Sequence, residues 1–337
     1  MNKRNLLTSL SQHLALVLIA ATLAGAVFSA WNVQAGVAST TILVTSPSDS
    51  LNTDGACTLR EAVIAANKDV ASGSGPGECP AGSGADTIVL PAGTYRLTRT
   101  DNGKEDSSST GDLDIRSDIR FITEGGQVTI NTGSGFKDRI FHVLSGNVSI
   151  SGVVLSGGNP SGDGGGIYNL ANLTLERVTL SGNVAGGRGG GIYTAGSLTL
   201  TNVTVSGNAS KTSGGGLFNF GGNAGLNNVT IAENTADSDA NGSGEGGGLF
   251  NQATLTIEHS TLKGNSAGGR GGGIYNTGSL KLNLTNATVS GNTSKVDGGG
   301  LFNFGGNASL NNVTIAENTA DSDASGSGDG GGVARIG

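Results

Sequence analysis

The stretch GGGIYTAGSLTLTNVTV at residues 189–205 decides the fold. Apolar side chains alternate with threonine on either side of a bend near Asn202; they are Leu198, Leu200, Val203 and Val205. Alternation with a period of two is typical of strands with one buried face. The stretch therefore predicts very short strands joined by a corner.

The glycine triplet of this stretch recurs seven times, with spacings of 25, 25, 32, 25, 27 and 32 residues. It begins at Gly164, Gly189, Gly214, Gly246, Gly271, Gly298 and Gly330. Periods of this size indicate one structural unit per repeat, stacked on its neighbours. Strands this short pair with the same strands of the next repeat, about 4.8 Å away. We therefore predict an all-β, right-handed parallel β-helix.

Composition agrees with this fold. The chain has 61 glycines but only 5 prolines among 337 residues, without a strict G-X-Y period, which excludes collagen. Abundant aliphatic residues argue against disorder, and 2 cysteines are too few for a disulfide-rich miniprotein. The net charge of -7 argues against a nucleic-acid partner.

Two further columns follow from the repeat. An asparagine after the second strand is expected to take the left-handed corner conformation and to form a hydrogen-bonded ladder, through Asn159, Asn183, Asn208, Asn234, Asn265, Asn292 and Asn318. One aromatic residue per coil predicts a stack, with a sugar-binding strip as the alternative, through Tyr168, Tyr193, Phe218, Phe250, Tyr275 and Phe302.

Charged residues precede most of the triplets. Cross-coil ion pairs are expected between Asp163 and Arg188, and among Glu245, Arg270 and Asp297. Residues 187–248 and 269–332 are near-copies, so a motif present in both counts as one observation.

Residues 1–35 are interpreted as a secretory signal peptide. Lys3 and Arg4 precede an apolar stretch at residues 14–23, and Ala35 ends a small-x-small cleavage pattern. A retained anchor helix is the alternative, although the apolar stretch is short for one. Export predicts a secreted or cell-surface location, and no later segment is expected to span a membrane.

We expect residues 36–110 to form an N-terminal cap with the first coils, and residues 111–337 to form the repeats. After the last triplet the repeat requires a full coil, but the chain stops at Gly337. This predicts a truncated end, or an end covered through end-to-end association with a partner chain.

Export also makes a disulfide between Cys57 and Cys79 the favoured state of the two cysteines. Two unpaired thiols are the alternative. A zinc site is not favoured, because the sequence offers no third cysteine and no nearby histidine.

The segment ACTLREAVIAAN at residues 56–67 predicts a short amphipathic helix, with Thr58 and Glu61 as a capping box. Together with DTIVLPAGTY and GDLDI at 111–115, the run Cys57-Thr-Leu-Arg-Glu-Ala resembles the CSLREA-motif proteins, with Thr58 in place of the usual serine. The resemblance implies an exported, right-handed parallel β-helix of the pectin-lyase-like superfamily, closed by a cap.

The SGN…GGGIY unit is similar to the repeats of polymorphic outer membrane proteins, which are surface adhesins and autotransporters. Their repeats carry phenylalanine where this chain has Leu180, Val205, Ile231, Leu262, Val289 and Ile315. Because of that departure, the resemblance concerns architecture rather than membership.

Candidate catalytic groups are few. His142 and His259 lie in different repeats, and no nucleophile motif accompanies them. Asp112 and Asp114 lie two apart, with Arg116 close behind, so they share one face of a strand. Paired carboxylates are what glycoside hydrolysis needs. We nevertheless interpret this segment as a solvated face, with Leu113 and Ile115 inward.

Calcium is the one cofactor that the sequence suggests. Asp237, Asp239, Asn241 and Glu245 match the oxygen-ligand positions of a calcium loop, although its final glutamate is replaced by Gly248. The second copy offers Asp321, Asp323 and Asp329. A plain solvated loop is the alternative.

The sequence therefore favours a non-catalytic, exported β-helix with an adhesin-like or structural role at a surface, whose partner is an extracellular glycan or a surface receptor. The alternative is a polysaccharide lyase or glycoside hydrolase on the same fold, which rests on analogy. A groove with converging aspartate and arginine or lysine would favour the enzyme, and a featureless column would favour the scaffold.

Overall fold

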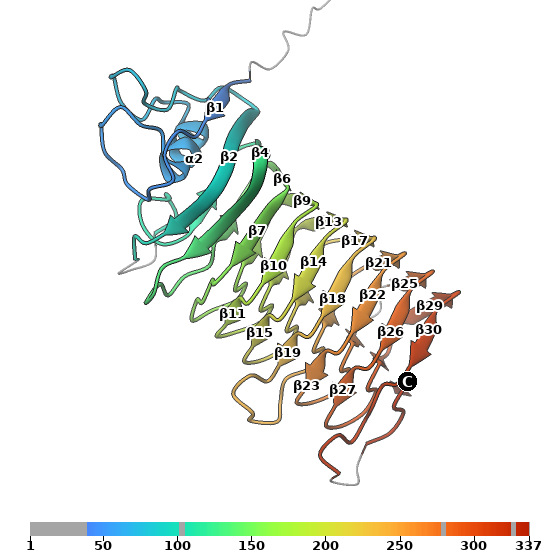
Figure 1. The fold of residues 1–337 in the computed structure, drawn as a ribbon. Coiled ribbons are helices and arrows are strands. Elements are labelled where there is room, and N and C mark those ends of the chain that lie inside the picture. The colour runs from blue at the N-terminus through green and yellow to red at the C-terminus, as the bar shows by residue number, and fades with distance from the viewer. Residues whose placement is uncertain (1–38, 101–104, 278–280, 325–327, 337) are drawn as a thin grey trace, which may run out of the picture. The chain divides into compact units, whose positions relative to one another are not determined.

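The computed structural model describes residues 39–100, 105–277, 281–324 and 328–336. The predicted signal peptide lies outside the described residues. From Ser39 onward the chain forms one unit, in which short strands stack coil upon coil (Figure 1). Every strand pairing between coils is parallel and joins equivalent positions of successive coils, as at Leu198↔Leu173 and Leu180↔Val205. The predicted parallel β-helix is confirmed.

The largest sheet supplies two faces of each coil. It begins with β1 (Thr41–Leu43), β2 (Asp86–Leu97) and β4 (Ile119–Thr132). The first part of β4 pairs with one strand of the next coil, and its last part pairs with another. One face continues through β6 (Asn147–Ser151), β9 (Asn172–Glu176), β13 (Ser197–Thr201), β17 (Ala224–Asn227), β21 (Leu255–Glu258), β25 (Lys281–Thr285) and β29 (Asn307–Asn311). The other continues through β7 (Val153–Ser156), β10 (Thr179–Ser181), β14 (Thr204–Ser206), β18 (Thr230–Ala232), β22 (Thr261–Lys263), β26 (Thr288–Ser290) and β30 (Thr314–Ala316).

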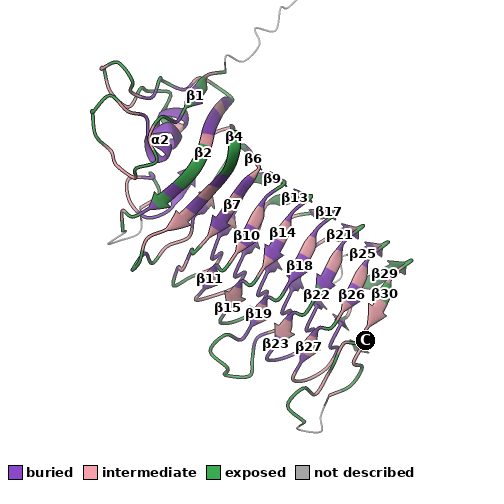
Figure 2. Ribbon diagram, viewed as in Figure 1, coloured by how far each residue is buried: buried purple, intermediate pink, exposed green. Residues whose placement is uncertain are grey.

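Two smaller sheets close each coil. The third face consists of β3 (Leu113–Ile115), β5 (Phe141–Val143), β8 (Ile167–Asn169), β12 (Ile192–Thr194), β16 (Leu217–Asn219), β20 (Leu249–Asn251), β24 (Ile274–Thr277), β28 (Leu301–Phe304) and β31 (Val333–Ile336). A corner is bridged by β11 (Val184–Ala185), β15 (Ala209–Ser210), β19 (Thr235–Ala236), β23 (Ser266–Ala267) and β27 (Thr293–Ser294). Buried and more exposed residues alternate along the strands (Figure 2), and the buried aliphatic side chains form one continuous core.

The glycine triplet is required by backbone geometry. Its first glycine has a left-handed φ in every copy, for example +68° at Gly189 and +67° at Gly271. At the second glycine, a Cβ would overlap carbonyl oxygens of the adjoining coil, as at Gly272 against Thr293 and Gly299. The triplet therefore lets one coil bend and also lets the next coil lie against its backbone.

The buried asparagine ladder exists, with one correction. The Nδ2 of Asn183 donates to Asn208 Oδ1 at 3.0 Å, and the same bond repeats down to Asn318. Asn159 is not part of it, because Gly158 occupies the equivalent position and its backbone N donates to Asn183 Oδ1. The left-handed corner residue is also not the ladder asparagine but the residue before it, such as Gly207 with φ +60°.

The aromatic column is confirmed as a stack. Successive ring centroids lie 4.5–5.5 Å apart from Tyr168 to Phe302, with interplanar angles of at most 17°. Arg188 lies over the rings of Tyr193 and Phe218 and pairs with Asp163 at 2.7 Å. Arg270 pairs with Asp297 at 3.0 Å, as expected.

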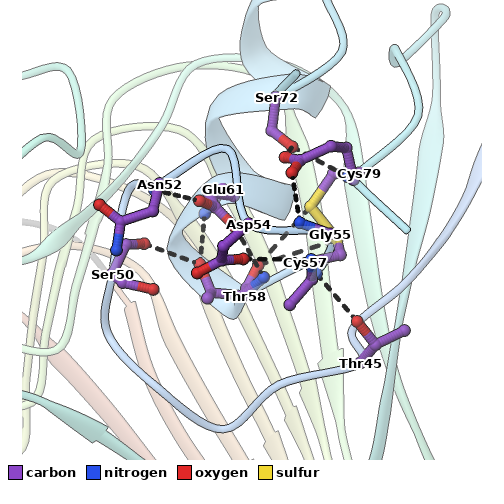
Figure 3. Close-up of a disulfide and its surroundings, with 12 residues drawn as sticks. Thr45, Ser50, Asn52, Asp54, Gly55, Cys57, Thr58, Glu61, Ser72 and Cys79 are labelled. Carbon is purple, nitrogen blue, oxygen red and sulfur yellow. Dashed lines mark hydrogen bonds between the residues drawn. A yellow bond between two sulfur atoms is a disulfide. The ribbon is translucent and has the colours of Figure 1, made fainter. Parts of the chain in front are cut away.

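The cap is the helix α2 (Leu59–Lys68), which begins at the predicted capping box of Thr58 and Glu61. A disulfide joins Cys57 and Cys79 beside this helix start (Figure 3). Glu61 also accepts a hydrogen bond from Asn52 N at 2.9 Å, which ties the preceding loop to the helix. The cap thus closes the first coil with covalent and polar contacts.

The last strands of the unit differ in how they are covered. β31 extends the third sheet beyond β28, whereas the residues of β29 are all exposed. End-to-end association through this last coil stays a prediction. No helix among the described residues is long and apolar enough to cross a membrane.

Candidate functional site

The first strands of the third sheet carry polar residues where later strands carry aromatic ones. Asp114 of β3 pairs in register with His142 of β5, which pairs in register with Tyr168 of β8. The outward column therefore begins with a carboxylate and an imidazole before the ring stack starts. The His142 ring lies 5.2 Å from Tyr168 and nearly perpendicular to it.

The prediction that Asp112 and Asp114 form a solvated face is wrong. Their exposed fractions are 3% and 0%. The segment 105–110 folds over β3, and Ser108 N donates to Asp114 Oδ2 at 2.9 Å. Arg116, in contrast, is exposed and lies 3.5 Å from Asp106.

Arg60 of the cap helix holds this segment in place. Its guanidinium is fully buried and contacts the Asp49 carboxylate at 2.5 Å. It also donates to the carbonyl oxygens of Ser108, Gly111 and Asp112 at 2.8–3.2 Å. The arginine of the CTLREA run and the GDLDI segment thus form one structural unit.

A hollow of about 630 Å³ opens beside these strands. Its wall consists of Glu105, Asp106, Asp112, Lys137, Asp138, Arg139, His142, Pro160, Ser161, Gly162, Asp163, Tyr168 and Leu170. Five of these residues are acidic and two are basic. The wall therefore carries an excess of negative charge when its carboxyl groups are ionised.

Arg139 contacts two carboxyl groups of this wall, those of Asp112 and Asp138. Arg139 Nη1 donates to Asp112 Oδ2 at 2.9 Å, and its guanidinium lies 5.3 Å from the Tyr168 ring centre. Burial raises the pKa of the Asp112 carboxyl well above its ordinary value, and the charges of Asp138 and Asp114 raise it further. The Arg139 charge acts in the opposite direction.

The candidate calcium loop, which contains Asp237, Asp239, Asn241 and Glu245 and lies in the described part of the chain, does not bring its carboxylates together as the predicted ligand pattern requires. Asp237 is 6% exposed, and its Oδ2 accepts from Gly242 N at 2.9 Å and lies 3.9 Å from Lys295 Nζ. Asn241 Oδ1 accepts from Ser243 N at 3.1 Å. Within the described residues, Asp237, Asp239 and Glu245 do not converge as a group of three ligands. In the second copy, residues 325–327 lie outside the described part. Calcium binding at these loops stays a prediction.

The aromatic column does not offer a strip of open ring faces. Tyr193, Phe218 and Phe250 are at most 6% exposed, and each ring stacks between its neighbours. Tyr168 has one face against Tyr193 and contacts His142 and Arg139 besides.

Sequence reasoning missed His142, Asp106 and Lys137 as site residues. A signal for His142 was present, because the segment Phe141–Val143 lies 26 residues before the first strand of the aromatic column. The local sequence pattern does not predict that Asp106 and Lys137 share a wall, because the folding of two loops brings them together.

The fold and the hollow define a parallel β-helix with a charged recess at its first coils. A family model described as the Chlamydia polymorphic membrane protein repeat matches residues 177–195 and 259–277. Each matched stretch includes a glycine triplet and the strand that follows it, β12 or β24, so the similarity concerns single coil segments. None of the curated proteins matches the chain.

Two solved structures match the chain. A crystal structure of pectate lyase Pel9A is 15% identical, with a TM-score of 0.43, over 90% of this chain and 80% of its own length. Geobacillus virus E2 ORF18 is 10% identical, with a TM-score of 0.33, over 70% of this chain and 53% of its own.

Proposed function

We propose that the protein works outside the cell or at the cell surface as a non-catalytic β-helix that binds an extracellular saccharide in the hollow at its first coils. The signal-peptide pattern of residues 1–35 supports export. The similarity of two coil segments to a Chlamydia polymorphic membrane protein repeat supports a surface role.

The observation that carries this proposal is the chemistry of the hollow. Its volume of about 630 Å³ lies in the range of small-ligand sites. Carboxylates and a guanidinium accept and donate the paired hydrogen bonds that vicinal hydroxyl groups offer. The excess of acidic groups favours a neutral or amino saccharide over a uronate polymer.

The test is retention of the purified chain on a panel of neutral, amino and acidic polysaccharides, with and without calcium. We expect retention on a neutral or amino polymer without release of reducing or unsaturated ends. Lys137→Gln and Tyr168→Phe should each weaken retention at least fivefold, because the first removes the ammonium charge from the wall and the second removes the phenol hydroxyl, while both keep the stack.

Matched controls come from later coils. Lys211→Gln and Tyr275→Phe make the same chemical changes away from the hollow, and we expect both to retain the polymer like the parent chain. Equal losses in both pairs of variants, or no retained polymer, would contradict saccharide binding in the hollow.

Hydrolysis is the second candidate function, and the convergence of Asp112 and Asp138 beside Arg139 favours it. Two carboxyl groups at one wall are the arrangement that glycoside hydrolysis uses. Release of reducing ends that disappears in both Asp112→Asn and Asp138→Asn would establish this activity. Release of unsaturated ends would indicate a lyase, and retention without either product would support the binding protein.

A further inference from the structure

Three potential metal ligands meet where the outward column begins. The Nδ1 atom of His142 lies 3.2 Å from Asp114 Oδ1 and 3.7 Å from Asp106 Oδ1. All three ligand atoms lie within 4.8 Å of one another. The residues come from β5, β3 and the segment that folds over β3, so only the folded chain brings them together.

The spacing fits a tetrahedral first-row metal. Bonds of about 2.0–2.2 Å to nitrogen and oxygen place neighbouring ligand atoms of a tetrahedral ion about 3.3–3.5 Å apart. The two distances from the imidazole lie on either side of that range. Small rotations of the half-exposed Asp106 side chain are enough to close the set around an ion.

A second, independent observation points to a bound cation. Asp114 is fully buried, and its Oδ1 has no hydrogen-bond partner although the imidazole is close. An ionised oxygen that is buried without a partner is costly. A cation between this oxygen and the imidazole nitrogen would satisfy both atoms.

The other oxygen of each carboxylate is already occupied. Asp114 Oδ2 accepts from Ser108 N at 2.9 Å, and Asp106 Oδ2 lies 3.5 Å from Arg116 Nη2. These contacts turn the Oδ1 atoms toward His142. Tyr168 packs edge to face against the imidazole and limits its rotation. Such outer contacts are how proteins orient metal ligands.

We propose that Asp106, Asp114 and His142 bind a first-row divalent metal ion, with Zn²⁺ as the best fit, at the wall of the hollow. Imidazole together with two carboxylates suits Zn²⁺ better than Ca²⁺ or Mg²⁺, which prefer oxygen ligands alone. The acidic excess of the hollow favours entry of a cation. Asp106 and His142 also line the hollow, so the ion would face any ligand bound there.

Calorimetric titration of the tag-free chain with ZnCl₂ alone tests the proposal. We expect one ion per chain, with binding weakened at least tenfold in His142→Gln and in Asp106→Asn. His259→Gln is the matched control, because His259 lies on a later corner where its ring contacts Asn286. That variant should bind like the parent chain.

Visible absorption of the Co²⁺-loaded chain is the second measurement. It requires no substitution of the buried Asp114, which could unfold the first coils. The parent chain and His259→Gln should show visible bands of nitrogen- and oxygen-bound Co²⁺, and His142→Gln should lose them. Absence of stoichiometric binding, binding of Zn²⁺ by His142→Gln and Asp106→Asn as tight as by the parent chain, or tighter binding of Ca²⁺ than Zn²⁺ would each overturn the proposal. Because no saccharide is present, the result is separate from that of the retention test.

Discussion

The first coils and the repeated coils use the same column positions in opposite ways. From Tyr168 to Phe302 the outward position of the third sheet is always aromatic, and each ring packs on the next. In β3 and β5 the same position holds Asp114, which is fully buried, and His142, which lines a hollow. Repetition stabilises the later coils, and the chemistry lies where repetition is interrupted.

The two regions also distribute their stability differently. In the repeated coils the ladder asparagines and the stacked rings between the end members have equivalents in both neighbouring coils, so these contacts recur from coil to coil. The first coils depend on single contacts, such as Arg60 with Asp49. Substitutions in the two regions should therefore differ in size.

The largest effect is expected for Arg60→Met. The change leaves the Asp49 carboxylate and three carbonyl oxygens without their buried partner. Breaking a buried ion pair from one side costs about 3–5 kcal/mol. Equilibrium denaturation should show a loss of this size. The exposed Arg96→Met serves as the control, and a similar loss there would show that Arg60 has no special role.

An intermediate effect is expected for Gly272→Ala in the repeated coils. The new Cβ would overlap the carbonyl oxygens of Thr293 and Gly299, and forced overpacking costs about 1–3 kcal/mol. Gly225→Ala is the control, because a Cβ there meets nothing within 4 Å and the near-copy carries Ser309 at that position. Denaturation midpoints that shift equally in both variants would contradict the packing role of the triplet.

The smallest effect is expected for Glu245→Gln. Burial raises the pKa of the Glu245 carboxyl, while the Arg270 charge partly opposes the shift. The folded state therefore binds this proton more tightly than the unfolded state does, so ionisation lowers stability as pH rises through the two pKa values. Glu245→Gln should gain less than about 1 kcal/mol at pH 7, because solvent screens a half-buried charge.

The pH dependence of the free energy of unfolding tests whether burial of the ionised carboxyl causes the gain of Glu245→Gln. At pH values well below the ordinary glutamate pKa of about 4.3, the carboxyl of the parent chain is protonated in both states, so the gain of Glu245→Gln should vanish there. Asp329→Asn makes the same change at the exposed equivalent position of the near-copy and should leave the free energy of unfolding unchanged. A gain of Glu245→Gln that persists at low pH would contradict the burial argument.

Sequence periodicity predicted the repeated coils well because each of their residues has one environment that recurs. The triplets, the ring stack and the asparagine ladder all follow from strict spacing. The errors arose at single residues. Asn159 was assigned to the ladder by residue type, although Gly158 occupies that register position.

The site was less accessible from sequence. Alternation placed Asp112 and Asp114 on the outer face of a strand, and only the folding of residues 105–110 over that face buries them. Contacts between non-repeated segments carry no periodic signal, so pattern analysis does not detect them.

The matching of backbone and side chains between coils has a consequence for how such a chain can evolve. Each repeated coil presents the same glycine carbonyls and the same ladder asparagine to both of its neighbours. A block of whole coils inserted by recombination in frame would therefore meet compatible partners at both joints. The number of coils can change without new chemistry, whereas the recess lined by Asp112 and His142 depends on the cap and cannot be multiplied in this way.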